Sequence, residues 1–101
     1  MAEWIRVAGT NEVKPGAGIV AEVGGKVLAV FNVDNTYHVI DNTCVHRGGP
    51  LGEGELEGEV VSCPWHGWQY SVKTGACVAN PAAKVTVYET TVEGSDIKAR
   101  L

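Results

Sequence analysis

The chain has 101 residues, of which 45% are hydrophobic and 20% charged, with a formal net charge of −4 at pH 7. We expect one globular domain over residues 1–101, with no nucleic-acid partner, because a nucleic-acid-binding face is rich in Lys and Arg. The sequence shows neither an apolar stretch long enough to span a membrane nor a signal peptide, so we expect a cytoplasmic protein.

Short runs of alternating hydrophobicity recur along the chain and predict β-strands. In chain order, the runs cover residues 5–8, 18–23, 26–33, 36–40, 60–63, 68–72, 84–92 and 96–101. Residues typical of tight turns separate them at 24–25, 34–35 and 93–96. No segment has a helical period, so the pattern predicts an all-β fold, an antiparallel β-sandwich or small barrel. The glycine-rich stretch 46–56 interrupts this pattern and is predicted to be a loop.

Two cysteines and two histidines occur in two short pieces of the chain, Cys44 with His46 and Cys63 with His66. One residue separates the first pair, two separate the second, and sixteen lie between His46 and Cys63. Two loops that each carry a thiolate and an imidazole can hold one metal centre between them, and these ligands suit zinc or iron. Structural zinc sites usually keep cysteines together and histidines together, whereas the alternation here favours an iron-sulfur centre with mixed ligands.

The spacing C-x-H-x16-C-x2-H, with GGPL after the first pair and CPWHGWQY around the second, resembles the Rieske family over nearly the whole chain. The resemblance implies a Rieske-like fold whose cluster-binding subdomain has two ligand loops, at about residues 42–70. It implies one [2Fe-2S] cluster per chain, with Cys44 and Cys63 on the buried iron and His46 and His66 on the outer iron. Val45 departs from the proline that is frequent at that position in the family.

The resemblance also implies a reduction potential near the low end of the Rieske range, roughly −150 to +300 mV. Gly49 and Trp65 stand where high-potential members carry two cysteines that pair, and Trp68 stands where they carry a serine that donates to a sulfide. Tyr70 matches the family's tyrosine near the first cysteine sulfur. The potential is expected to fall with rising pH as the histidine ligands lose protons.

The function that the resemblance implies is that of a ferredoxin, a one-electron carrier and not an enzyme. It would pass electrons from a flavin-dependent reductase to a terminal oxygenase, as in aromatic hydrocarbon catabolism, and would work as a monomer. No catalytic nucleophile, mononuclear iron site or nucleotide-binding motif is recognisable. Two alternatives stay open: a small subunit of the nitrite reductase type, and an interaction module held together by a Cys2His2 zinc site.

Other polar residues are expected to be structural. Cys77 is predicted to be a buried free thiol, His38 a structural histidine, and Asp41 and Asn42 residues that shape the turn into the first ligand loop. Four glutamates alternate along the chain between the two ligand pieces: Glu53, Glu55, Glu57 and Glu59. They form either a solvated hairpin edge or a negative surface that attracts a basic partner protein.

Overall fold

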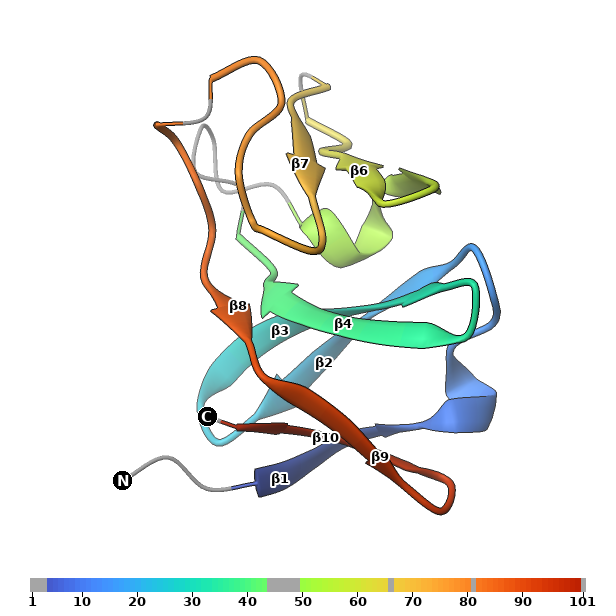
Figure 1. Ribbon diagram of the computed structural model, residues 1–101. Coiled ribbons are helices and arrows are strands. Elements are labelled where there is room, and N and C mark those ends of the chain that lie inside the picture. The colour runs from blue at the N-terminus through green and yellow to red at the C-terminus, as the bar shows by residue number, and fades with distance from the viewer. Residues whose placement is uncertain (1–3, 44–49, 66, 81, 101) are drawn as a thin grey trace.

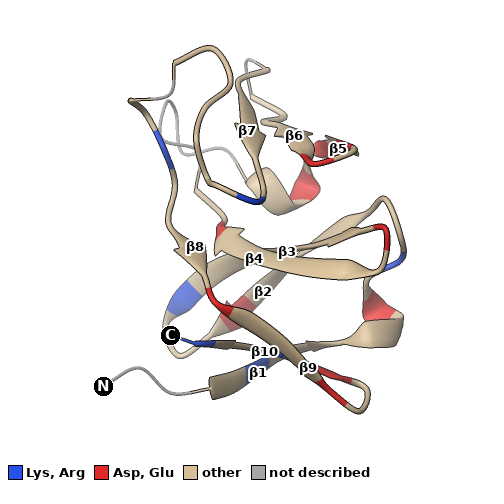
Figure 2. Ribbon diagram, viewed as in Figure 1, with Lys and Arg blue, Asp and Glu red and all other residues tan. Residues whose placement is uncertain are grey.

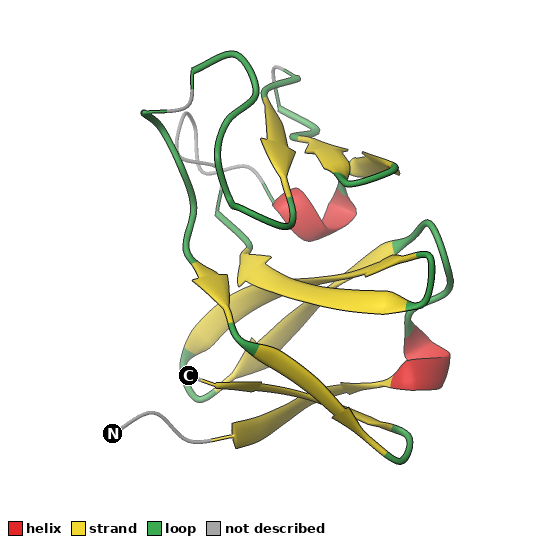
Figure 3. Cartoon of the chain, in the orientation of Figure 1, coloured by secondary structure: helices red, strands yellow, loops and turns green. Residues whose placement is uncertain are grey.

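The computed structural model describes residues 4–43, 50–65, 67–80 and 82–100. The described residues form ten strands and two short 3-10 helices, and none of these helices is long and apolar enough to cross a membrane. Figure 3 shows how little of the chain is helical. All strand pairs are antiparallel, so the predicted all-β antiparallel fold is confirmed.

The strands make three sheets (Figure 1). The base sheet contains β1 (Trp4–Gly9), β10 (Asp96–Arg100) and β9 (Thr90–Glu93). The middle sheet contains β2 (Gly18–Val23), β3 (Lys26–Val33), β4 (Thr36–Asp41) and β8 (Val87–Tyr88). The small sheet contains β5 (Glu55–Glu57), β6 (Val60–Ser62) and β7 (Gln69–Ser71). The 3-10 helices are η1 (Thr10–Glu12), after β1, and η2 (Leu51–Glu53), before β5.

The middle sheet separates two hydrophobic cores, because successive side chains of a strand point to opposite faces. Leu28 and Val30 of β3 belong to the base core, whereas Ala29 and Phe31 belong to the upper core. The base core consists of Val7, Ala8, Val13, Ala21, Leu28, Val30, Val39, Ile97 and Ala99. The upper core consists of Ala29, Phe31, Ile40, Leu51, Val61, Cys63, Tyr70, Val72, Cys77 and Val85. The small sheet and both ends of each predicted ligand loop are therefore built on the upper face of the middle sheet.

Two of the predicted turns set the register of the middle sheet. The β2–β3 turn has Gly24 and Gly25 at φ 58° and 80°, and the β3–β4 turn has Asp34 and Asn35 at 54° and 69°. Two successive positive φ values suit the right-handed twist of a two-residue hairpin, which is why Gly, Asn and Asp occur there. The turns fix the pairs Val20↔Ala29 and Ala29↔Ile40, and these place Ala29 and Ile40 beneath the small sheet.

The structure differs from the sequence prediction in two places. The predicted run 84–92 begins too early, since β8 starts at Val87, and it is split at Glu89, because β8 pairs with β4 in the middle sheet while β9 pairs with β10 in the base sheet. The predicted loop 46–56 is wrong at its C-terminal end, where η2 and then β5 form. In β5 only Leu56 turns inward, toward the upper core, and both flanking glutamates are exposed.

Candidate metal centre

The ends of the first predicted ligand loop are tied together by Asn42. Its backbone carbonyl accepts a hydrogen bond from Leu51 N–H at 2.7 Å, and its side-chain Oδ1 accepts one from Gly52 N–H at 2.7 Å. Thr43 and Pro50 form an isolated antiparallel bridge just inside this clamp. Cys44 and His46 lie in the segment 44–49, which is outside the described residues.

The ends of the second predicted ligand loop are closed by backbone hydrogen bonds, and beside them Gln69 Nε2 donates to Ser62 Oγ at 3.3 Å. Cys63 N–H donates to Trp68 O at 2.7 Å, and Gly67 N–H donates to Cys63 O at 3.1 Å. Gly67 has φ 74°, in the left-handed region that glycine enters without strain. His66 is outside the described residues.

Both loops begin and end in the same part of the molecule. Leu51, directly after the first loop, and Cys63, at the start of the second, belong to the upper core, and Trp68 packs against it. Gly54 lies between the two, since a Cβ atom at this position would contact Leu51 O at 3.1 Å and would collide with Ser62 O. The predicted ligand loops are thus neighbours in space.

Solvent exposure changes sharply along the second loop. Cys63 is only 2% exposed, whereas Pro64 and Gly67 are exposed and Trp65 is 51% exposed. A buried thiol followed by a surface turn fits a Rieske centre, in which cysteines hold one iron and histidines the other. Among the described residues no group of three His, Cys, Asp or Glu side chains can hold a metal ion. Because three of the four predicted ligands lie outside those residues, the ligand set stays a prediction.

Tyr70 and Cys77 lie in the upper core, together with Leu51 and Cys63. Tyr70 is fully buried on β7, opposite Val61, and forms an isolated bridge with Cys77. Cys77 is 1% exposed and forms no disulfide, so the predicted buried free thiol is confirmed. The placement of Tyr70 beside the first cysteine sulfur stays a prediction.

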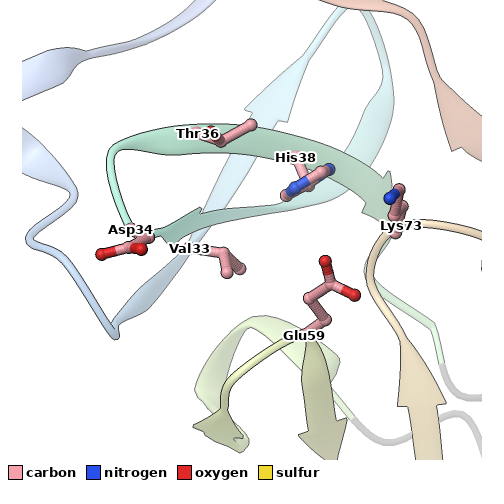
Figure 4. Close-up of a pocket in the computed structure, with 6 residues that line it drawn as sticks. All are labelled: Val33, Asp34, Thr36, His38, Glu59 and Lys73. Atoms are coloured by element: carbon pink, nitrogen blue, oxygen red, sulfur yellow. The ribbon is translucent and has the colours of Figure 1, made fainter.

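A polar pocket of about 300 Å³ opens between the middle sheet and the small sheet (Figure 4). Its lining residues are Val33, Asp34, Thr36, His38, Glu59 and Lys73. In Figure 4 the Glu59 side chain points from the β5–β6 turn toward the strand that carries His38. Burial lowers the pKa of His38, with a smaller opposing effect of the Glu59 carboxylate and a further lowering by Lys73. The sequence did not reveal this pocket, because Glu59 and Lys73 reach it from turns far along the chain.

The four alternating glutamates are all exposed, and Figure 2 shows acidic residues on β5. Strand β5 is one of the two edge strands of the small sheet, and charged side chains on an edge strand discourage pairing with other chains. The four ion pairs found among the described residues involve Arg6, Lys98 and Arg100, and none includes these glutamates. Their carboxylates therefore present negative charge to solvent. This agrees both with a solvated hairpin edge and with a negative surface that attracts a basic partner protein.

The fold and the loop geometry define a small antiparallel β protein with a separate loop-bearing subdomain, and comparison with known proteins identifies its family. The family model described as the Rieske [2Fe-2S] domain matches residues 3–89, so the chain belongs to the Rieske family, whose cofactor is a Rieske-type [2Fe-2S] cluster.

One relative is Ferredoxin CarAc of Metapseudomonas resinovorans, which is 32% identical over 93% of this chain and 90% of its own. The structure of the ferredoxin of carbazole 1,9a-dioxygenase from Nocardioides aromaticivorans IC177 superimposes with a TM-score of 0.87 at 30% identity, covering 96% of each chain. A complex of reduced oxygenase and oxidized ferredoxin in carbazole 1,9a-dioxygenase matches with a TM-score of 0.85 at 30% identity, over 96% of this chain and 92% of that one.

A structure named as an NADH-dependent nitrite reductase small subunit from Mycobacterium tuberculosis has a TM-score of 0.88 but only 21% identity, over 98% of this chain and 95% of its own. At that identity the likeness concerns the fold alone.

Proposed function

We propose that this protein is a Rieske-type ferredoxin that carries single electrons between a flavin-dependent reductase and a terminal oxygenase. Cys44 and Cys63 would bind the inner iron of the cluster, and His46 and His66 the outer one. Bound in this way, the cluster accepts and releases one electron, and its two histidine ligands raise its potential relative to an all-cysteine cluster. The chain itself performs no chemical conversion of a substrate.

The observation that carries this proposal is the family match combined with the change in exposure along the second loop. The chain buries the Cys63 thiol in the upper core and exposes the residues on either side of position 66. The cysteine side of the centre would then be shielded from water, while the histidine side faces a docking protein. A short path through a surface imidazole suits transfer to a partner that binds only briefly.

The partner classes come from the relatives, two of which are ferredoxins of dioxygenase systems. We propose a terminal oxygenase as electron acceptor and a flavin-dependent reductase as donor, with the protein working as a cytoplasmic monomer of one domain. The cluster-binding part would include residues 42–70, and the segment to Val85 packs in the same upper core. The exposed glutamates of β5 would favour a partner with a basic surface.

Two other functions have weaker support. A nitrite reductase small subunit shares the fold at low identity, but the ferredoxin relatives are more similar in sequence over nearly the same length. A zinc module would place tetrahedral zinc at the same four residues. It would leave unexplained the alternation of cysteine and histidine, which the Rieske family shares.

The two buried cysteines of the upper core provide a matched test of the ligand set. Cys63→Ser is expected to abolish the cluster, whereas Cys77→Ser is expected to retain about two irons per folded chain, because only Cys63 is a proposed ligand. Iron and acid-labile sulfide are measured per chain, and the dithionite-reduced protein is examined by EPR for the low average g of histidine ligation. A colourless parent with one zinc per chain contradicts the proposed function, and a cluster that survives Cys63→Ser contradicts the ligand set.

A further inference from the structure

The two ligand loops are held at their ends by different means. The second loop is closed by backbone hydrogen bonds of Cys63, Gly67 and Trp68, with an exposed side-chain hydrogen bond from Gln69 Nε2 to Ser62 Oγ beside them. The first loop is closed partly by a side chain, the buried carboxamide of Asn42. A single substitution can therefore loosen one loop and leave the other intact.

Asn42 connects three segments. Its N–H donates to Val27 O in β3 at 3.2 Å, its carbonyl accepts from Leu51 N–H, and its Oδ1 accepts from Gly52 N–H. The residue is 6% exposed, and no buried side-chain polar atom among the described residues lacks a hydrogen-bond partner. Asn42 thus fastens both the entry and the exit of the first loop to strand β3 of the middle sheet.

The approach of Gly52 to Asn42 is close enough to depend on the absence of a side chain. A Cβ atom at Gly52 would lie 2.7 Å from Ile19 O, 2.7 Å from Val20 Cγ2 and 3.0 Å from Asn42 Oδ1. Real Cβ atoms essentially never approach other heavy atoms within 3.0 Å, so a larger residue would move the strand or the loop exit. The hydrogen bond from Gly52 N–H to Asn42 Oδ1 therefore requires glycine at position 52.

We propose that Asn42 is a positioning residue for the cluster: its side chain fixes the ends of the first loop, the segment that carries the proposed ligands Cys44 and His46. This inference rests on the proposed function. Asn42 is not a ligand and acts through the loop that carries two ligands. Groups that orient metal ligands typically cost about ten- to a hundredfold in metal affinity when removed.

The chain offers a matched control in Asn32, at the end of β3 beside the base core. Asn32 is 1% exposed, its Nδ2 donates to Val13 O at 2.8 Å, and its Oδ1 accepts from Asn35 N–H at 2.8 Å. It is a buried, loop-fixing asparagine like Asn42, but it fixes a hairpin turn on the side away from the upper core. Asn32→Ala therefore reports the general cost of losing such a residue.

The experiment compares Asn42→Ala, Asn42→Ser and Asn32→Ala, each purified with its cluster. The decay of visible absorbance in excess chelator gives the rate of cluster loss, EPR of the reduced protein reports the ligand geometry, and thermal unfolding of the metal-free forms reports the fold. Asn42→Ala is expected to lose its cluster about tenfold faster than the parent or more, with an altered EPR spectrum. Asn42→Ser, which keeps a weaker oxygen acceptor, is expected to lie in between. Asn32→Ala should lose its cluster at the parental rate even where its melting temperature falls as far as that of Asn42→Ala.

The outcomes separate this inference from the function on which it rests. A parent that binds no iron contradicts the proposed function and the inference together. A parent that binds the cluster, with Asn42→Ala and Asn32→Ala losing it at equal rates, overturns the inference alone. If Asn42→Ser loses its cluster as fast as Asn42→Ala, the faster loss is due to packing, and the proposed role of the hydrogen bond is overturned. If Asn42→Ala does not fold, Asn42→Ser and Asn32→Ser are compared by the same criteria.

Discussion

At the scale of single residues, His38 is the histidine whose surroundings the structure describes in full. It is half-buried on β4 and faces Asp34, Glu59 and Lys73 across the pocket. Burial lowers its pKa more strongly than the Glu59 carboxylate raises it, and Lys73 lowers it further. The folded protein therefore binds a proton at His38 less readily than the unfolded chain does.

This difference predicts that the free energy of unfolding depends on pH through His38. Since the folded pKa lies below the unfolded value of about 6.5, the contribution of His38 is complete above that pH and is lost as pH falls through the folded pKa. Urea unfolding at several pH values between about 5 and 8 should show the parent losing more stability on acidification than His38→Gln does. If the free energy of unfolding depends on pH equally in both proteins, His38 does not contribute to that dependence.

At the scale of elements, the small sheet depends on the close approach of β5 to β6. Gly54 precedes β5 with φ −77°, an ordinary value, so the need for glycine there is steric and not conformational. An added Cβ would collide with Ser62 O, and the strands would have to separate. The entry to β5 therefore tolerates no side chain.

Gly54→Ala is accordingly expected to destabilise the protein by about 1–3 kcal/mol, the usual cost of overpacking. Gly58→Asn is the control in the same sheet, because Gly58 has φ 60° with open space around it and asparagine tolerates that conformation. Chemical unfolding of the two variants measures the difference. A smaller loss in Gly54→Ala than in Gly58→Asn would contradict the steric argument.

Most elements were predictable from the sequence because alternation and turn residues agree. The bounds of β2 and β3 match the predicted runs, and Gly24–Gly25 and Asp34–Asn35 form the predicted hairpin turns. Strand β5 was missed because Glu55–Glu57 contains a single apolar residue among charged ones, which gives too little periodicity to recognise. The switch at Glu89 was missed because residues 84–92 are rich in Val and Thr on both sides of Glu89, so that they read as one strand, while the hydrogen-bonding partners change from β4 to β10.

The ligand set of the candidate site stays a prediction from the sequence, and the residue that ties the ends of its first loop was not predicted. Spacing alone placed Cys63 among the ligands, and the change in exposure along its loop agrees with a buried thiol. Asn42 was expected only to shape a turn, since nothing in its neighbourhood shows that its carboxamide reaches Gly52, ten residues further along the chain. Such a contact depends on how η2 is placed beside Asn42, and no local pattern encodes it.

At the scale of the whole molecule, exposed apolar side chains occur both near the ligand loops and on the base sheet. Trp65 is 51% exposed in the second loop, and Trp4 is 44% exposed on β1 at the opposite end of the molecule (Figure 1). Exposed tryptophans are frequent anchors of protein interfaces, and only one of these two stands beside proposed ligands. The tryptophan of the loop is therefore expected to contact the partner proteins.

Trp65→Ala is predicted to slow electron transfer to a terminal oxygenase that the parent protein reduces by about fivefold or more at subsaturating concentrations, with iron content unchanged. Stopped-flow oxidation of the reduced protein measures the rate. Trp4→Ala, with a similar loss of exposed area, should transfer electrons at the parental rate. Equal slowing by both substitutions would place the docking face elsewhere.

Strand β3 lies between the two hydrophobic cores, and this position affects how the protein unfolds. Leu28 and Val30 line the base core, and Ala29 and Phe31 line the upper core. Neither core can therefore unfold without exposing one face of β3 to water. The loop-bearing part and the base should melt in a single cooperative transition despite their separate sheets. Protection of the β3 amides against hydrogen exchange should then equal that of global unfolding, even in protein stripped of metal.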